Sequence, residues 1–256
     1  MTPLRPHGAS IGKSPAAALR AGRGGLGGGR LAPAWGAEVV SSNIVGYHKL
    51  DLPANDFFIG GSQFTTVGEA DTIGVQDLMS SGLAEGDSIQ FFQGSSYHTF
   101  TYYDVNFDED WNEIGAGFTD EETGTIGTKE VSLGEAFWIK TGANTTVVFN
   151  GEVKTNATVT VSCGGGFALT AVPCPASVSL QDVKFDGIAE GDSIQFREGN
   201  GYHTFTYYDV NFDEDWNEVG PGWTDEETGV LANLQLDLNK GFWLKAAADT
   251  VTISVK

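Results

Sequence analysis

Short runs of β-branched and aromatic residues, broken by glycine-rich turns, recur along the chain from about residue 41 to the C-terminus. Such runs fit the pleated, half-buried surface of a β-strand. Helix-period patterns of ten or more residues are missing, and the 35 glycines supply turns at close intervals. The pattern therefore predicts an all-β protein of the sandwich or small-barrel kind.

The predicted strands are short and closely spaced. Two of them, 88–92 and 97–103, are joined by a Gln-Gly-Ser-Ser link, and the corresponding link further along the chain is Gly199-Asn200-Gly201. Asn-Gly between two strand-like runs is the strongest short signal for a hairpin. The remaining predicted strands are 48–52, 57–60, 76–79, 111–118, 129–133, 136–141, 145–149, 158–162, 167–172 and 250–255.

The chain contains a long internal repeat. Residues 82–151 align without a gap on residues 187–256 at an offset of 105, and 41 of these 70 positions are identical. The segment YHTFTYYDVNFDEDWNE is unchanged at 97–113 and 202–218, whereas 125–151 agrees with its counterpart at only six positions. Function, a shared packing demand, or recent copying of one stretch of gene onto the other would each explain the unchanged segment.

The repeat divides the chain into two homologous domains. We expect tandem antiparallel β-domains at 38–150 and 151–256, each a sandwich or small barrel that buries its own core. No Gly/Ser linker separates them, so the domains are expected to lie close together. Residues 1–37 are basic and rich in Gly, Ala and Pro, but they lack the apolar stretch of a secretory signal. We interpret them as a disordered leader that is either not native or a degraded export signal.

The charge is unevenly distributed. The chain has a formal net charge of −20, and its first 37 residues hold five basic groups and no acid. Residues 38–256 therefore hold 14 − 5 = 9 basic and 34 acidic groups, a net charge of −25. Such a body repels phosphate backbones and anionic lipids, which excludes nucleic-acid binding. No run of 18 apolar residues exists, so membrane insertion is not expected.

Only two cysteines are present, Cys163 and Cys174, and both positions differ in the first copy. Their joint absence there suggests a pair. A hairpin could bring two positions eleven residues apart face to face, because a strand rises about 3.3 Å per residue. The alternatives are a disulfide, which would indicate an oxidising compartment, and two buried free thiols.

Several stretches of the chain resemble a loose group of uncharacterised secreted bacterial proteins built of short β-rich modules. The likeness rests on the start SSNIVGY at 41–47 and on four stretches in each copy, of the types GDxIQF, YxxFxY, GWxD and GxxFW. In this chain they occupy 86–91, 97–102, 117–120 and 134–138, and again 191–196, 202–207, 222–225 and 240–243. The resemblance implies export and a non-catalytic role at the cell surface, and it assigns no site residues.

The unchanged segment places carboxylate and amide oxygens at alternate positions. This spacing begins as a calcium-binding EF-hand loop does, where the cation takes six to eight oxygen ligands. Glu109 stands where that loop needs glycine, and Gly115 stands where it needs a bidentate Glu, so we predict a looser calcium-binding turn, with a solvated acidic loop as the alternative. The candidate ligands are Asp104, Asn106, Asp108, Asp110 and Glu113, with Asp209, Asn211, Asp213, Asp215 and Glu218 in the second copy.

The same segment is dense in aromatic residues. Strand alternation places Phe100 and Tyr102 on one face and Tyr97 and Tyr103 on the other. One face must make the core, and rings exposed on the other face, flanked by Asp and Asn, suit the apolar faces and hydroxyls of sugars. Core packing of all these rings is the alternative. The candidate ligand-binding residues are Tyr97, Tyr102, Tyr103, Trp111, Tyr202, Tyr207, Tyr208, Trp216 and Trp223.

No arrangement of residues indicates catalysis. His98 and His203 are copies of each other, and histidines in mid-strand beside Thr and aromatics are more often packing residues than bases. No nucleophilic triad, Cys/His metal cluster or phosphate-binding loop has a recognisable signature. A glycosidase needs two carboxylates across a cleft, and Asp108, Asp110 and Glu113 stand instead in a predicted exposed turn. No catalytic residue is predicted.

These features together predict a non-enzymatic, secreted or cell-surface structural or adhesive protein made of duplicated β-modules. The alternative is a pair of calcium-assisted carbohydrate-binding modules that use the tyrosines and the acidic loop. The expected partners are glycans or other cell-surface proteins, and calcium is the one candidate cofactor.

Overall fold

The structure is a computed structural model that describes residues 44–68, 71–108, 110–213 and 215–255. The predicted leader, 1–37, and the first residues of the first predicted domain lie outside this range. Strands make up nearly all of the regular structure, and every strand pair is antiparallel. Within the described residues, no helix is long and apolar enough to span a bilayer.

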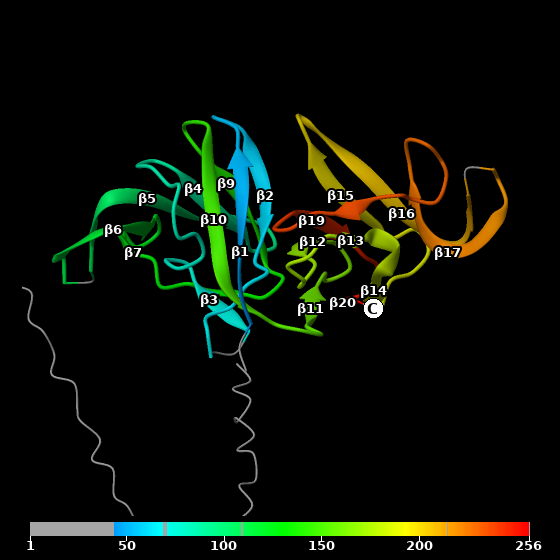
Figure 1. Ribbon diagram of the computed structural model, residues 1–256, viewed down its shortest axis with the longest axis horizontal. Coiled ribbons are helices and arrows are strands. Elements are labelled where there is room, and N and C mark those ends of the chain that lie inside the picture. The colour runs from blue at the N-terminus through cyan, green and yellow to red at the C-terminus, as the bar shows by residue number, and fades with distance from the viewer. Residues whose placement is uncertain (1–43, 69–70, 109, 214, 256) are drawn as a thin grey trace, which may run out of the picture. The chain divides into compact units, whose positions relative to one another are not determined.

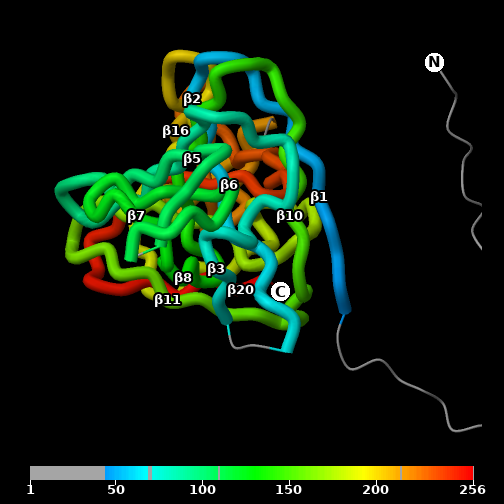
Figure 2. Tube along the Cα trace, turned by 90° about the vertical axis from the view of Figure 1, so that its left-hand side faces the viewer, coloured from blue at the N-terminus to red at the C-terminus, as the bar shows by residue number. Residues whose placement is uncertain are grey.

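The first half of the described chain contributes ten strands. They are β1 (Ile44–Leu52), β2 (Phe57–Gly61), β3 (Thr72–Gly74), β4 (Ser88–Phe92), β5 (Tyr97–Phe107), β6 (Glu113–Asp120), β7 (Thr125–Ile126), β8 (Glu130–Ser132), β9 (Ala136–Lys140) and β10 (Thr145–Val153). The largest sheet has the order β2-β9-β4-β5-β6-β7. A ribbon of β1 and β10 and a short pair of β3 and β8 complete the half, and β1 lies beside β10 over its whole length (Figure 1 and Figure 2).

The second half repeats this plan. Its elements are β11 (Thr158–Ser162), β12 (Phe167–Ala171), β13 (Val178–Ser179), the 3-10 helix η1 (Leu180–Asp182), β14 (Val183–Asp186), β15 (Ser193–Glu198), β16 (Gly201–Phe212), β17 (Glu218–Asp225), β18 (Gln235–Leu236), β19 (Gly241–Lys245) and β20 (Thr250–Val255). The main sheet has the order β12-β19-β15-β16-β17, beside a three-stranded sheet, β11-β20-β14, and the pair β13-β18. The predicted all-β antiparallel fold in two halves is confirmed.

Each half encloses a hydrophobic core under its main sheet. Alternate residues of the strands point inward, so a strand with one buried face contributes every second side chain to the core. The two cores use equivalent positions of the repeat. Fully buried members are Ile89, Phe91, Phe100 and Phe137 in the first half, and Ile194, Phe196, Phe205 and Phe242 in the second.

One predicted strand, 76–79, is wrong. The chain turns there, because the side chain of Gln76 takes the hydrogen bonds that a strand partner would take. Gln76 Nε2 donates to Phe118 O (2.8 Å) and Gly127 O (2.9 Å), and Phe118 N donates to Gln76 Oε1 (2.9 Å). Gln181 makes the equivalent bonds in the second half. A residue that satisfies two carbonyls and one amide by itself needs no neighbouring strand.

The predicted boundary between the domains, 150/151, falls inside β10, which continues through Val153. The first half therefore runs three residues further along its last strand before the chain crosses to β11. Cys163 and Cys174 are both free thiols, so of the two predicted alternatives the structure has no disulfide between them. Cys163 is buried, and its burial, followed by the charge of Asp192, raises the pKa of its thiol, whereas Cys174 is only half-buried.

The two halves pack on each other within a single compact unit. Gly61 N donates to Asn239 O (2.9 Å), and Ala171 N donates to Gly134 O (2.8 Å). These bonds are equivalent, because Gly61 pairs with Ala136 and Ala171 pairs with Gly241, which is the counterpart of Ala136 at the offset of 105. Gly134 corresponds to Asn239 at the same offset. The contact is thus reciprocal, as in a twofold-symmetric dimer in which both partners use the same surface.

Small residues allow this approach of backbone to backbone. A Cβ atom on Gly61 would lie 2.2 Å from Ala171 Cβ, and a Cβ atom on Gly241 would lie 2.6 Å from Ile59 Cγ2. A small third cluster of buried side chains surrounds the contact, formed by Ile59, Ala136, Trp138 and Ala171. The strands that meet here, β2 and β9 from one half and β12 and β19 from the other, lie at one end of each main sheet.

Candidate functional site

The unchanged segment forms a long hairpin in each half. In the first half, β5 and β6 pair outward to Phe107 and Glu113, and the chain then reverses. Asp108 N donates to Asn112 O (3.0 Å), and Trp111 N donates to Asp108 O (3.0 Å). The same two bonds, at the same distances, close the second hairpin. These bonds close a tight loop at the end of each hairpin. The tryptophan within this loop has an unusual backbone conformation.

We call the outer end of each hairpin its tip. The described residues of the first tip are Asp104, Val105, Phe107, Asp108, Asp110, Trp111, Asn112, Glu113 and Ile114, and those of the second are Asp209, Val210, Phe212, Asp213, Asp215, Trp216, Asn217, Glu218 and Val219.

The tryptophan of each tip has a left-handed backbone. Its φ is 61° at Trp111 and 62° at Trp216. A short hairpin loop normally places glycine at this position, because a Cβ atom is strained there by about 1–2 kcal/mol. The other non-glycine residues with positive φ in the described chain are all asparagine, which tolerates this conformation best: Asn55, Asn156 and Asn239. Loop formation therefore does not account for tryptophan at these two positions.

Burial does not account for these tryptophans either. Trp111 is 68% exposed and Trp216 is 67% exposed. The Trp111 indole leans on Phe107, with ring centroids 6.1 Å apart and planes tilted by 42°, and Trp216 leans on Phe212 in the same way. Each ring is held by a neighbour on one side and offers much of its surface to solvent.

The carboxylate of Asp108 holds the loop together. Its Oδ1 accepts hydrogen bonds from Asp110 N (2.9 Å) and Asn112 N (2.8 Å), and both of its oxygens accept from Asn112 Nδ2. The Asn112 amide, followed by the backbone N–H groups, lowers the pKa of Asp108. Asp213 makes the same bonds in the second tip. An ionised Asp108 therefore keeps the strained tryptophan in place.

The rest of the tip is apolar surface set among acids. Val105 and Ile114 are exposed, as are their counterparts in the second tip. No Lys or Arg occurs between residues 97 and 128 or between residues 202 and 239. The exposed acids of the first tip are Asp104, Asp110 and Glu113. Each tip thus presents hydrophobic side chains in a strongly negative setting.

The predicted aromatic residues differ in their surroundings. The exposed ones are Tyr97, Trp111, Tyr202 and Trp216. Tyr103 and Tyr208 are half-buried, and their hydroxyls donate to Glu121 (3.3 Å) and Glu226 (3.4 Å). The charge of Glu121 raises the pKa of Tyr103, and Glu226 acts in the same way on Tyr208.

The other three predicted aromatic residues belong to the cores. Tyr102 and Tyr207 meet Phe118 and Trp223 edge-on, with ring centroids 5.6 Å apart in both halves. Trp223 is only 2% exposed and packs edge-on against Phe185 at 5.1 Å. The ring of Trp223 therefore fills the second core where Phe118 fills the first, and a ligand could reach it only if this part of the core opened.

The predicted cation ligands do not gather. Asn106 is buried at a β-bulge, where its Oδ1 accepts from Phe107 N (3.0 Å) and Thr119 Oγ1 (3.1 Å). Asn211 is buried at the equivalent bulge of the second half and makes the equivalent bonds, so the side-chain oxygens of both asparagines already have partners within the fold. Among the described residues, no three His, Cys, Asp or Glu side chains are placed to share a metal ion. Calcium binding by the remaining acids, Asp104, Asp108, Asp110 and Glu113 with Asp209, Asp213, Asp215 and Glu218, stays a prediction.

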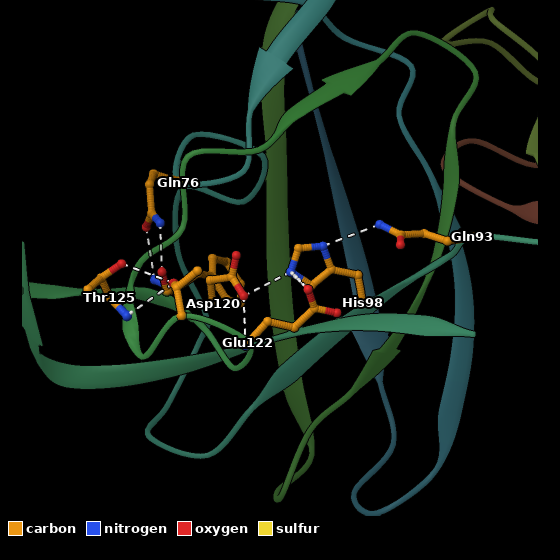
Figure 3. Close-up of polar contacts among 8 residues, drawn as sticks. Gln76, Gln93, His98, Asp120, Glu122 and Thr125 are labelled. Atoms are coloured by element: carbon orange, nitrogen blue, oxygen red, sulfur yellow. Dashed lines mark hydrogen bonds and ion pairs between the residues drawn. The ribbon is translucent and has the colours of Figure 1, made fainter. Parts of the chain in front are cut away.

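A histidine and an aspartate join the two strands at the base of the hairpin (Figure 3). His98 Nε2 lies 2.8 Å from Asp120 Oδ1, and Gln93 Nε2 lies 3.3 Å from His98 Nδ1. Asp120 Oδ1 also accepts from Glu122 N (2.8 Å). Burial would raise the pKa of Asp120, but the hydrogen bonds from His98 and Glu122 outweigh it and lower that pKa. The pair fastens the start of β5 to the end of β6.

The second half changes one partner of this pair. His203 Nε2 lies 2.9 Å from Asp225 Oδ1, and Glu198, which replaces Gln93 in the repeat, places Oε2 3.8 Å from His203 Nδ1. Burial would lower the pKa of His203, but the hydrogen bond and charge of Asp225, with the charges of Glu227 and Glu198, raise it overall. A carboxylate on each side of the ring favours the imidazolium.

In the described structure, the ionisable groups of His98 and of one pocket between the halves are engaged with neighbouring side chains. Both ring nitrogens of His98 have partners, and no hydroxyl or thiol nucleophile is bonded to the ring in the described structure. A pocket of about 390 Å³ between the halves contains Glu135 as its one carboxylate, and Lys129 pairs with that group at 2.9 Å.

Neither a family model, a curated protein nor a solved structure matches this chain, so the resemblance to secreted bacterial proteins stays a prediction. Sequence reasoning missed two features of the hairpins. The strain at Trp111 had one visible signal, a hairpin loop without glycine. The role of Gln76 had another, since Gln76-Asp77 recurs as Gln181-Asp182 at the offset of the repeat.

Proposed function

We propose that this chain is a non-enzymatic adhesive protein that acts outside the cell or at its surface and binds through its two tips. The exposed, left-handed tryptophan at the same place in both tips carries the proposal. A residue in a strained conformation that neither the loop nor the core requires is the usual mark of a functional position. Large exposed aromatic side chains are also the residues that dominate binding energies at interfaces.

The topology supports two independent binding sites. In each main sheet, the strands that touch the other half lie at one end, and the hairpin strands lie towards the other end. The contact between the halves therefore leaves both tips uncovered. Two equal sites on one chain bind a repetitive surface much more tightly than one site does, because the second contact forms at a high effective concentration.

The test compares retention of the protein on a panel of surfaces coated with polysaccharides, with proteins or with charged alkyl groups. The variants are Trp111→Asn, Trp216→Asn and the two together, since asparagine fits the left-handed backbone. We expect each single variant to dissociate at least about tenfold faster than the parent, and the double variant to lose retention. Tyr47→Ser removes an equally exposed ring outside the tips and should change nothing. A double variant that stays on every surface that holds the parent would overturn the proposal.

One observation favours the carbohydrate-binding alternative. Each exposed indole lies beside carboxylate and amide groups of the same tip, and Tyr97 and Tyr202 are exposed as well. Flat rings next to hydrogen-bonding groups suit sugars. A glycan array with residues 38–256, run with calcium and with a chelator, separates the two functions, because only calcium-assisted modules lose their glycans in chelator.

A further inference from the structure

We propose that each tip docks a cationic, partly apolar segment of a partner protein, with a Lys or Arg side chain seated on the tryptophan. The inference rests on the proposed binding role of the tips and names the chemistry of the partner. It starts from the apolar surface of the tip, where Val105, Trp111 and Ile114 are all exposed. A partner has to cover these side chains to gain hydrophobic energy from them.

The charges around the tip determine the sign of the partner's charge. No described Lys, Arg or His lies within ion-pair distance of Asp104, Asp110 or Glu113, and the same holds for the second tip. Such unpaired carboxylates repel anionic lipids and nucleic acids, and they attract basic side chains. They also raise the rate of association with a basic surface at low salt.

The ring itself suits a cation. Tryptophan gives the strongest cation–π interaction of the aromatic side chains. Five of the eight described Lys and Arg side chains of this protein lie over rings elsewhere: Lys129 over Phe91, Lys140 over Phe57, Arg197 over Trp138, Lys240 over Phe196 and Lys245 over Phe167. None of the described cations lies over Trp111 or Trp216. The two most exposed indoles among the described residues are thus open to a cation from another molecule.

The apolar and the charged features select one class of partner. A purely ionic partner would leave Trp111 and Ile114 in water, and a purely apolar partner would bury the acids without compensation, which costs free energy. A basic residue with aliphatic neighbours satisfies both, because the long stem of Lys or Arg covers apolar surface while its head meets carboxylates.

The probes for the test are short immobilised peptides of equal length that alternate Lys with Leu, Glu with Leu, Ser with Leu, or Lys with Ser. We expect the full chain to bind the Lys-Leu peptide at least about tenfold more tightly than the other three, with an affinity that falls as salt rises. The variant that joins Asp104→Asn, Asp110→Asn and Glu113→Gln with their second-half equivalents should lose that preference. The matched control, Glu121→Gln with Glu226→Gln, neutralises acids outside the tips and should keep it.

The outcomes separate the two proposals. Equal binding of the Lys-Leu and Glu-Leu peptides, or an unchanged preference in the neutralised variant, would overturn the cationic partner. If Trp111→Asn with Trp216→Asn still loses surface retention in that case, the adhesive role stands and only the partner class falls. Binding to glycans without binding to the Lys-Leu peptide would assign the tips to sugars and overturn the inference. A double tryptophan variant that behaves as the parent everywhere would remove both.

Discussion

The two halves of this molecule agree at their exposed tips and differ where they touch each other. The tips are identical from Asp104 to Glu113 and from Asp209 to Glu218, and each carries an exposed tryptophan with a left-handed backbone. At the contact between the halves, Gly61 faces Ala171, and Ala136 has Gly241 as its counterpart. Buried contacts usually constrain sequence more than exposed loops do. Packing therefore does not explain why the exposed residues of the tips are unchanged, and function and recent gene copying remain as explanations for them.

The differences at the contact have a steric reason. A reciprocal interface brings equivalent residues of the two halves close together, so two identical side chains would compete for one space. Gly61 and Ala171 occupy that space as a pair in which only one member has a Cβ atom. Because this pair has only one Cβ atom, the backbones approach closely enough to form the two reciprocal hydrogen bonds.

The largest loss of stability is expected from a substitution at the contact between Gly61 and Ala171. Gly61→Ala would place a Cβ atom 2.2 Å from Ala171 Cβ, so we expect the free energy of unfolding to fall by about 2–3 kcal/mol. Ala171→Gly in the same chain should restore most of the loss, because it removes the other Cβ atom. The measurement is urea denaturation followed by circular dichroism.

Gly201→Ala is the control for this pair, since the nearest neighbour of its added Cβ atom is 3.9 Å away. Equal midpoints for Gly61→Ala and Gly201→Ala would show that the halves do not meet as described.

A smaller loss of stability is expected when the side-chain amide of Gln76 or Gln181 is removed. The two losses compare equivalent bonds in the two halves. Gln76→Ala removes three hydrogen bonds of 2.8–2.9 Å and leaves buried backbone groups unpaired, which costs about 2 kcal/mol. The corresponding bonds of Gln181 measure 3.1–3.4 Å, so Gln181→Ala should cost less. Thermal unfolding of both variants checks the order, and a greater loss for Gln181→Ala would contradict it.

Substitution of the tip tryptophans by asparagine should increase the stability of the protein. Trp111→Asn relieves the left-handed strain and is expected to raise the free energy of unfolding by about 1 kcal/mol, with the same gain for Trp216→Asn because the two φ values agree. Trp111→Ala keeps a Cβ atom in the strained conformation and should give no gain. Chemical denaturation compares the three variants. A loss of stability in both asparagine variants would mean that the tryptophans serve the fold.

The smallest effect concerns pH. The pKa of His203 is raised above 6.5, so its protonation stabilises the fold fully below about pH 6.5, and the stabilisation is lost as the pH rises through the folded-state pKa. Glu198→Gln should reduce the change in stability between about pH 6 and pH 8.5, by well under 1 kcal/mol after screening by solvent. Unfolding measured at the two pH values tests this effect, and identical profiles for the parent and the Glu198→Gln variant would contradict it.

Much of the fold was predictable from local pattern. The strands at 88–92, 158–162 and 250–255 have the predicted bounds, because alternation and turn residues act within a few neighbours. The strand predicted at 76–79 failed because its hydrogen-bonding partner is a side chain, Gln76, that reaches groups 42 and 51 residues away. Propensity cannot show such a bond.

The candidate site was likewise predictable from the sequence only in part. The sequence marked the acidic, aromatic segment as the important one, because the repeat left it unchanged. It could not show that Trp111 is exposed while Trp223 is buried, since Trp111 and Phe118, the counterpart of Trp223, both lie in one predicted strand, 111–118. Nor could it show that Asn106 turns inward at a bulge, where strand alternation no longer holds.

The sequence by itself determined that the protein is all-β, that it is built twice on one plan, and that its body is strongly acidic. These properties depend on composition, on periodicity over a few residues and on comparison of the chain with itself. Only the tertiary structure decided which rings lie in the cores, which meet solvent, and how the halves fit through Gly61 and Ala171. Those features arise from contacts between residues far apart in the chain, and burial and steric fit exist only once such residues have been brought together.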